Sequence, residues 1–394
     1  MKQIQKVNKE DMRQNNALLV FETIYRNEGI TRTQLAAQTK MSAMTVGRIV
    51  DFLLSHELLA ERMSKKSSDI GRPASRLYLN HGIVSIGVSL DPSGIYIGLV
   101  DPYGNLLKFR EYKIEPERLQ PEELLEIVAE QIQEFITENA LDGTQSVGIV
   151  VPALIDSKNQ TVKISSQFKW IDVPVMEILG KYPHLPQILL DNDTKARAQA
   201  ESRFRSVKKC DNLVLFNIGS GIGSGVIINN EIYRGKENFA GEIGHTMLSM
   251  NNRICECGRK GCIEATISLY SVLREARAID PDIDLAGLER AYQENVAWAR
   301  TLLNMTAENI LMVINLLANA YAPDVIVLCG SLVDQCETLR KIIIEAHAER
   351  YLEVFNNNFE LEFSQFGSNG NLIGAAALAF NHNIEQYIAC SENS

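Results

Sequence analysis

The sequence predicts an α/β protein with a small helical N-terminal domain and a larger two-lobed body. A chain of 394 residues is too long for one compact core, because single domains usually hold on the order of 100 to 200 residues. Helical apolar spacing and then a hairpin pattern fill the first 80 residues, and strands alternate with helices after them. A tight group of cysteines adds a metal-binding knuckle. We therefore expect domains at residues 1–80 and 81–394.

The composition indicates a folded globular protein. Hydrophobic residues make up 45% and charged residues 22%, with 25 Gly and 11 Pro, which excludes a disordered, collagen-like or disulfide-stapled chain. The longest apolar stretch, Ile310 to Ala322, is interrupted by two Asn residues and is shorter than the roughly 18 apolar residues that a membrane span needs. Residues 1–11 are polar and lack a signal-peptide core. We expect a cytoplasmic protein without membrane insertion.

Charge is unevenly distributed along the chain. The net charge is −10, but residues 1–80 carry +5 and the remainder carries −15. A basic N-terminal domain on an acidic body can contact a polyanion while the body binds something else. The alternative is a chance fluctuation, because +5 over 80 residues is modest.

The N-terminal domain has the pattern of a helix-turn-helix. Apolar spacing predicts a first helix over 15–27, a short helix after Thr31 and a longer helix after its N-cap, Ser42. If the third helix packs through its apolar residues, the face of its N-terminal half that would meet base edges carries Ala43, Thr45, Gly47 and Arg48. An arginine there can donate a two-pronged hydrogen bond to guanine or phosphate.

Two alternating segments, 58–63 and 75–79, predict a hairpin beside the third helix. Its tip carries Lys65, Lys66 and Arg72, and the sequence Gly71-Arg72-Pro73 resembles tripeptides that place an arginine in the DNA minor groove. A basic hairpin next to a helix-turn-helix predicts a winged helix-turn-helix domain that binds double-stranded operator DNA. The alternative is a helical protein-interaction module with a solvated hairpin.

The body repeats one order of elements. Three strands (83–89, 95–100 and 105–113) are followed by a helix and a strand, and a similar order begins at residue 212. This recurrence predicts two related lobes, divided near residue 190, with a cleft between them.

A glycine run at 219–225 joins two of these strands. A dinucleotide fingerprint needs a helix after its glycines, but Val226-Ile227-Ile228 predicts a strand, which excludes a Rossmann site. Glycines between two strands let backbone amides approach an anion, as in the phosphate loops of the actin and sugar-kinase fold, which is ribonuclease H-like. A glycine-rich hairpin without a ligand is the alternative.

The residues with the most specific chemistry are His245, Cys255, Cys257 and Cys262. Three thiolates and one imidazole form a four-coordinate zinc site, and a full ligand set leaves no open position for an activated water. The predicted metal is therefore structural Zn²⁺. The alternative is a set of buried free cysteines near an unrelated histidine.

Polar side chains are expected to converge on the cleft. Asn192 and Asp193 follow an apolar strand, whereas Glu242 and Glu264 flank the zinc knuckle. Amide and carboxylate groups together suit the adjacent hydroxyls of a sugar. Taken singly, each carboxylate would be a helix cap or a solvated surface group.

Together these motifs resemble the signatures of the ROK family (repressors, open reading frames, kinases). The matching segments are 241–245, the Cys-x-Cys-Gly-x-x-Gly-Cys-x-Glu run ending at Glu264, Asn192-Asp193 and 219–223. With the N-terminal domain, the whole chain resembles the repressor branch, which includes xylose and N-acetylglucosamine repressors. The resemblance implies a sugar site formed by Asn192, Asp193, Glu242, His245 and Glu264. It also implies that the counterpart of Asp193 is the catalytic base in the kinases.

The chain departs from the kinase pattern where the nucleotide would bind. The customary Asp-Gly-Gly-Thr is replaced by Asp91-Pro92-Ser93, in which proline removes a backbone donor and the aspartate repels phosphate. The paired glycines at the adenine end read Cys329-Gly330, and Ala153 and Gln167 depart on the sugar side.

These departures predict a repressor without enzymatic activity. We expect it to bind operator DNA as a homodimer or a dimer of dimers, and to be released by a sugar or sugar phosphate. A sugar kinase with a DNA-binding head is one alternative. A repressor controlled by a protein partner, such as a sugar-transport component, is the other.

Overall fold

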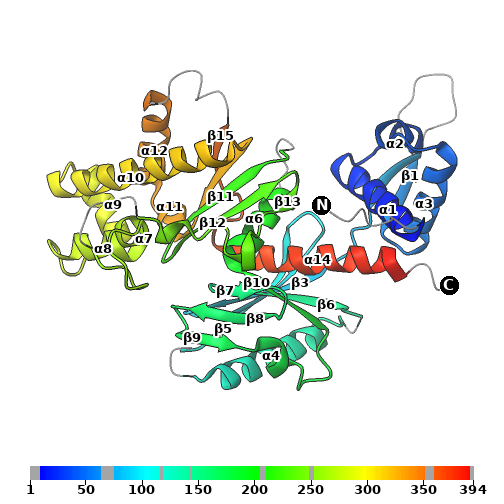
Figure 1. The fold of residues 1–394 in the computed structure, drawn as a ribbon, viewed down its shortest axis with the longest axis horizontal. Coiled ribbons are helices and arrows are strands. Elements are labelled where there is room, and N and C mark those ends of the chain that lie inside the picture. The colour runs from blue at the N-terminus through cyan, green and yellow to red at the C-terminus, as the bar shows by residue number, and fades with distance from the viewer. Residues whose placement is uncertain are drawn as a thin grey trace, which may run out of the picture. The chain divides into compact units, whose positions relative to one another are not determined.

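The computed structural model describes residues 9–63, 75–115, 119–141, 143–204, 210–247, 253–350 and 359–390. The chain divides into two compact units (Figure 1). The first consists of residues up to Ser85, Asp101–Asn105 and residues from Phe380 onward; the second consists of Ile86–Val100 and Leu106–Ala379.

The first unit contains three helices and a two-stranded antiparallel sheet. Its elements are α1 (Lys9–Arg26), α2 (Arg32–Thr39), α3 (Ala43–Ser55), β1 (Leu59–Met63) and β2 (Ser75–Leu79). Local signals fix the helix ends: Thr31 and Gln34 form a capping box at α2, and the Ser42 hydroxyl accepts a hydrogen bond from the amide of Thr45 (3.1 Å) at α3. The three predicted helices and both strands are present, although α1 begins earlier than residue 15.

The core of the first unit includes residues from distant parts of the chain. Phe21, Leu53 and Leu77 are fully buried in a cluster that also contains Phe380 and other residues of the C-terminal helix, α14 (Gly370–Cys390). In the loop at 101–105, the Tyr103 hydroxyl donates a hydrogen bond to Glu28. A division at residue 80 therefore omits two segments that complete this unit.

The second unit contains two five-stranded sheets, and the elements before and after Asp193 are called the first and the second lobe here. The first lobe contains β3 (Ser85–Asp91), β4 (Gly94–Val100), β5 (Leu106–Lys113), α4 (Pro121–Glu138), β6 (Ser146–Val151), β7 (Leu154–Asp156), β8 (Thr161–Ser165), β9 (Trp170–Val173), α5 (Val175–Leu179) and β10 (Gln187–Asn192). The second lobe contains α6 (Asp193–Phe204), β11 (Leu213–Ile218), β12 (Ile222–Ile228), β13 (Glu231–Ile232), η2 (Lys236–Asn238), η3 (Ile243–His245), α7 (Glu264–Ile267), α8 (Leu269–Arg277), α9 (Leu285–Gln293), α10 (Ala297–Tyr321), β14 (Val325–Cys329), α11 (Ser331–Gln335), α12 (Glu337–Arg350), β15 (Glu360–Phe363), η4 (Gly367–Asn369) and the start of α14.

The two five-stranded sheets share one topology. Their strand orders are β10-β6-β3-β4-β5 and β15-β14-β11-β12-β13. In each, three consecutive strands lie beside two later strands, and those later strands are parallel to their neighbours. The predicted recurrence of elements is confirmed at the level of topology. A separate three-stranded sheet, β7-β8-β9, was not predicted.

The second sheet is covered by helices on both faces (Figure 1). Side chains of β11 alternate between the two faces. Val214 and Phe216 pack with residues of α10 and α12, whereas Leu213 and Leu215 pack against Ala198 of α6. Strands buried on both faces have nearly continuous apolar sequences, as β11 and β14 do. This packing fixes the position of α6, which begins at Asp193.

Helix α10 is long and apolar enough to cross a membrane, judged by length and composition alone. Leu303, Ile310 and Ile314 on this helix are fully buried in the core of the second lobe. Helix α10 is therefore a core helix of the second lobe.

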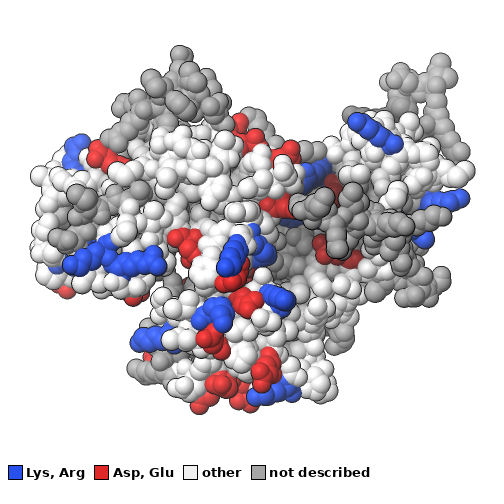
Figure 2. Space-filling view, in the orientation of Figure 1, with Lys and Arg blue, Asp and Glu red and all other residues white. Residues whose placement is uncertain are grey.

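The negative charge of the second unit is not gathered into one patch on the face seen in Figure 2. Acidic and basic side chains are interspersed there.

Candidate functional site

A large cleft of about 1850 Å³ lies in the second unit. The residues implied as sugar ligands all contribute to its lining: Asn192, Asp193, Glu242, His245 and Glu264. The structure thus brings together side chains from β10, α6, η3 and α7, which are as many as 72 positions apart in the sequence.

The junction of β10 and α6 places two of these residues. The Asn192 amide donates to the carbonyl oxygen of Ala153 (3.0 Å), and its Oδ1 accepts from the backbone amide of Lys195 (2.9 Å). Asp193 is the first residue of α6 and accepts from the amide of Thr194 (2.8 Å). Burial raises the pKa of Asp193 to about 6, and the nearby carboxylates of Glu242 and Asp91 contribute.

The glycine run allows α6 to pack closely on β12, and it also contributes to the lining of the cleft. A Cβ at position 225 would lie 2.4 Å from the Cβ of Ala198, so α6 can approach β12 this closely only if that residue is glycine. Gly219 and Gly221 line the cleft. Strand β12 begins at Ile222, inside the glycine run. Gly223 and Gly225 therefore belong to the sheet against which α6 packs. The anion-binding role stays a prediction.

Two further glycines fix the segment that carries Glu242 and His245. Gly241 has a φ of +93°, and a Cβ there would lie 2.0 Å from the carbonyl oxygen of Ser224. A Cβ at Gly244 would lie 2.3 Å from the carbonyl oxygen of Ile222. The segment is therefore pressed against β12, and both polar side chains are held at the cleft.

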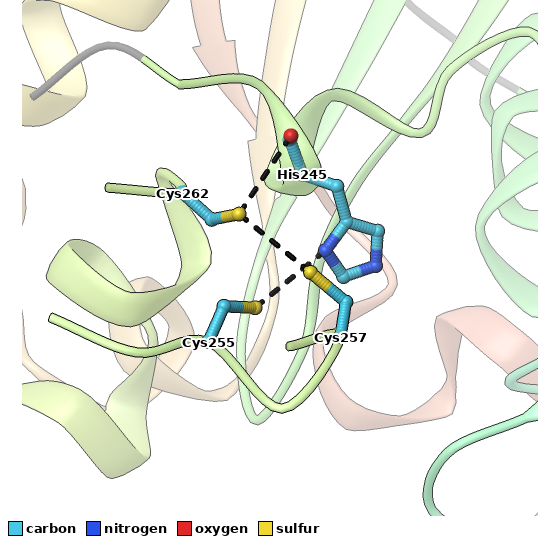
Figure 3. A group of neighbouring side chains, drawn as sticks. All are labelled: His245, Cys255, Cys257 and Cys262. Atoms are coloured by element: carbon cyan, nitrogen blue, oxygen red, sulfur yellow. Dashed lines mark hydrogen bonds between the residues drawn. The ribbon is translucent and has the colours of Figure 1, made fainter. Parts of the chain in front are cut away.

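The predicted metal ligands form one group (Figure 3). Their ligand atoms all lie within 4.8 Å of one another: His245, Cys255, Cys257 and Cys262. Cys255 Sγ lies 3.7 Å from His245 Nδ1, and Cys257 Sγ lies 3.7 Å from Cys262 Sγ. A tetrahedral ion with metal–sulfur bonds of about 2.3 Å separates two sulfur ligands by about 3.8 Å. The group could therefore hold a metal ion with little rearrangement.

Glu264 connects the cysteine group to the cleft. One carboxylate oxygen accepts from the Cys255 thiol (3.4 Å), and the other accepts from the backbone amide of Ile222 (3.3 Å) in β12. A change at the cysteines would therefore reach a residue that lines the cleft.

The segment that departs from the kinase pattern also lines the cleft, and its Asp91 carboxylate is near enough to Asp193 to help raise the pKa of that residue. Asp91 accepts from the backbone amide of Ser93 (2.9 Å) and from its hydroxyl, and the Ser93 hydroxyl also lies 2.7 Å from that of Tyr96. Arg197, which also lines the cleft, forms an ion pair with Asp334 (3.4 Å). These polar groups are therefore bonded to one another.

In the first unit, the predicted DNA-contacting residues of α3 lie mainly at the surface. Ser42, Ala43 and Arg48 are exposed, and Thr45 is half-buried. Met44, which was not among the predicted contacts, is 70% exposed in the same turn. The predicted contacts Lys65, Lys66 and Arg72 lie outside the described residues.

Sequence reasoning missed a charged network beneath the cleft. Lys195 and Asp191 are buried, and Asp191 is paired with Arg234. The apolar spacing of α6 gives no sign that position 195 faces inward, because its partners are distant in the sequence.

The sequence and the fold are similar to those of known proteins. Residues 85–382 match the ROK family. The chain belongs to the ROK family. The xylose repressor of Bacillus spizizenii is 27% identical over 370 residues, covering 93% of this chain and 95% of the relative. The glucokinase of Thermotoga maritima is 26% identical over 311 residues, covering 74% of this chain and 96% of the relative. A solved ROK family transcriptional regulator, a homologue of the E. coli MLC protein, has a TM-score of 0.78 at 23% identity and covers 96% of this ROK chain and 97% of its own; at that identity it supports the fold alone.

Proposed function

We propose that this ROK protein is a sugar-responsive transcriptional repressor of carbohydrate uptake or catabolism genes. A sugar bound in the cleft releases it from its operator. The observation that carries the proposal is coverage: the xylose repressor aligns with 93% of the chain, whereas the glucokinase aligns with 74%. D-xylose is accordingly the first sugar to test.

The first unit would be the winged helix-turn-helix that contacts double-stranded DNA. In this assignment α3 enters the major groove with Ser42, Ala43, Thr45 and Arg48, and the segment between β1 and β2 adds Lys65, Lys66 and Arg72. Exposure of Arg48 on α3 supports it. The protein would act in the cytoplasm as a homodimer or dimer of dimers, so that two heads meet a pseudo-palindromic operator.

The polar residues of the cleft would bind the sugar. Asn192, Asp193, Glu242 and Glu264 offer carboxylate and amide groups to adjacent hydroxyls. His245 can serve two roles, because its Nδ1 faces the cysteine sulfurs and its other ring nitrogen lies on the far side of the ring (Figure 3). A histidine that binds a metal through one nitrogen commonly donates a hydrogen bond through the other.

The metal at the cysteine group would be structural zinc. Three thiolates and one imidazole suit Zn²⁺ and complete its tetrahedral coordination. Its contribution would be to hold His245 at the cleft and to fix the loop that ends at Cys262, two residues before Glu264.

The segment at 91–93 supports binding without phosphoryl transfer. Pro92 and Ser93 stand where the kinase pattern has its two glycines, and Ser93 bonds to the Asp91 carboxylate through both its amide and its hydroxyl. Pro92 lacks the backbone donor that a phosphate-binding turn uses. The kinase alternative is favoured by the positions of Asp193 and of Gly219 and Gly221 of the glycine run, all of which line the cleft.

One set of assays separates these functions. Thermal denaturation with a panel of sugars and sugar phosphates identifies the ligand, since a ligand at 100 times its dissociation constant stabilises by about 2.7 kcal/mol. The ligand should then lower operator affinity in a fluorescence anisotropy titration. ADP release of about 1 per second or faster with ATP and that sugar would instead establish a kinase. Operator release by a transport protein, with no response to any sugar, would establish control by a partner.

A further inference from the structure

Lys195 is a fully buried lysine beneath the candidate sugar site. It is 1% exposed and follows Asp193 by two positions in α6. Residues two positions apart on a helix point in different directions, so Asp193 reaches the cleft while Lys195 points toward the segment after β13. Its ammonium donates to the carbonyl oxygen of Asn238 (2.8 Å) and lies 3.7 Å from Glu242 Oε1.

Asn238 is itself held from two sides. Its side-chain amide donates to the carbonyl oxygen of Ile155 in β7 (3.1 Å), and its Oδ1 accepts from Arg234 (3.1 Å). Arg234 forms two hydrogen bonds with Asp191 in β10, at 2.9 and 2.6 Å. Asn238 adopts a φ of +64°, a conformation that asparagine tolerates better than most residues. The network therefore joins α6, β7, β10 and η2.

A buried ammonium group at this position destabilises the fold unless other interactions compensate for it. Moving an ammonium out of water is unfavourable, and an apolar side chain of similar length would fill the same space without that penalty. Burial accordingly lowers the pKa of Lys195, whereas the carboxylates of Glu242, Asp191 and Asp193 oppose this effect. Two of those carboxylates line the cleft and repel each other, and Lys195 is placed where its charge offsets that repulsion.

We propose that Lys195 is a positioning residue of the sugar site, holding Glu242 toward the cleft and allowing it to share the site with Asp193. It acts through Glu242 rather than by touching the sugar. The inference rests on the proposed function, because it assumes that Glu242 and Asp193 bind a sugar. It predicts that Lys195 sets sugar affinity while the metal and operator sites are unaffected.

The test is a double-mutant cycle in the full chain, with D-xylose and the most stabilising sugar of the panel as probes. Calorimetry should give a sugar affinity at least roughly tenfold weaker for Lys195→Met, and Lys195→Arg should restore most of the loss. The change Glu242→Gln should weaken binding as well. Adding Lys195→Met to Glu242→Gln should then cause little further loss, because the partner has already been removed. In a Gln167→Ala background, which lies in the cleft and outside the network, the full loss should persist.

A second variant keeps the test decisive if Lys195→Met does not fold. Lys195→Gln retains a donor for Asn238 but removes the charge, and it should also weaken binding. Wild-type affinity in folded Lys195→Met or Lys195→Gln, or independent effects of Lys195→Met and Glu242→Gln, would overturn the proposal while leaving the sugar-binding function standing. Failure of the wild-type protein to bind any sugar of the panel would instead refute the proposed function, and this inference with it.

Discussion

Two sets of carboxylates line the cleft and are positioned in different ways. Asp193, Glu242 and Glu264 are brought together from α6 and from either side of the cysteine group, and close packing on β12 fixes their segments. Asp91 is instead bonded to Ser93 within its own turn, where Pro92 and Ser93 replace the two glycines of the kinase pattern. The first set offers several oxygens to one ligand, as the proposed sugar site requires, whereas the second lacks the glycine turn expected for a nucleotide.

Loss of the metal should have the greatest effect. Replacing Cys257 by alanine removes one of four ligands, and we expect the variant to lose its zinc and its sugar response together, because His245 is itself a ligand and Glu264 follows Cys262 by two positions. Atomic emission on the purified protein measures the zinc, with Cys210→Ala as a control that keeps it. Stoichiometric zinc in Cys257→Ala would refute the ligand assignment.

The change Asp193→Asn removes the charge of a single carboxylate in the cleft. A sugar hydroxyl bound to a carboxylate contributes about 1.5 to 3 kcal/mol, so sugar affinity should fall roughly 10- to 150-fold. Operator binding without sugar should stay close to wild type. Calorimetry and anisotropy measure the two affinities, and Glu111→Gln on the exposed face of β5 provides a matched control. Lost operator binding with wild-type sugar affinity would contradict the division of labour between the two units.

A loss of about 1 to 3 kcal/mol of operator affinity is expected for Arg48→Ala, because this removes one base or phosphate contact. Sugar affinity of the free protein should be unchanged, since Arg48 lies in the first unit and the cleft in the second. Competition binding with operator and random duplexes measures the specificity. Unchanged operator preference would remove α3 from the proposed DNA contact.

The smallest effect is a pH dependence of sugar binding. The pKa of Asp193 is raised to about 6, so its carboxylate gains a proton as the pH falls through 6 and can no longer accept as a charged group. Sugar affinity should be constant above about pH 7 and fall at most tenfold per pH unit below 6. Calorimetry between pH 5 and 8 tests this, and Asp193→Asn should remove the dependence. A wild-type profile that is flat across that range would contradict it.

The same carboxyl should influence stability with the opposite sign. Its pKa is higher in the folded protein than in the unfolded chain, so the folded state binds the proton more tightly. The contribution of Asp193 to the free energy of unfolding therefore decreases from about pH 4 to pH 6 and is constant above. Comparison of wild type with Asp193→Asn in urea isolates this contribution.

Features with local causes could be predicted from the sequence. Thr31 and Ser42 cap helices through neighbouring residues, and the spacing of Cys255, Cys257 and Cys262 alone indicated a metal group. Alternating and continuous apolar runs were sufficient to predict the recurrence of strands that the two five-stranded sheets show.

Features that depend on distant contacts could not be predicted. The strands β7, β8 and β9 are short and expose residues such as Ile171, so they lack a clear apolar pattern. Phe380 belongs to the core of the first unit only because α14 returns to it. Lys195 resembles a solvated helix residue until the buried groups around it are known.

Sugar in the cleft and operator at the first unit should oppose each other without any phosphate transfer. Calorimetric titration of the effective sugar, with and without saturating operator, measures this coupling. A coupling of roughly 1 to 3 kcal/mol should make sugar binding 5- to 150-fold weaker on the operator complex, by the same factor that sugar weakens operator binding. Equal sugar affinities in the two titrations would contradict sugar-driven release.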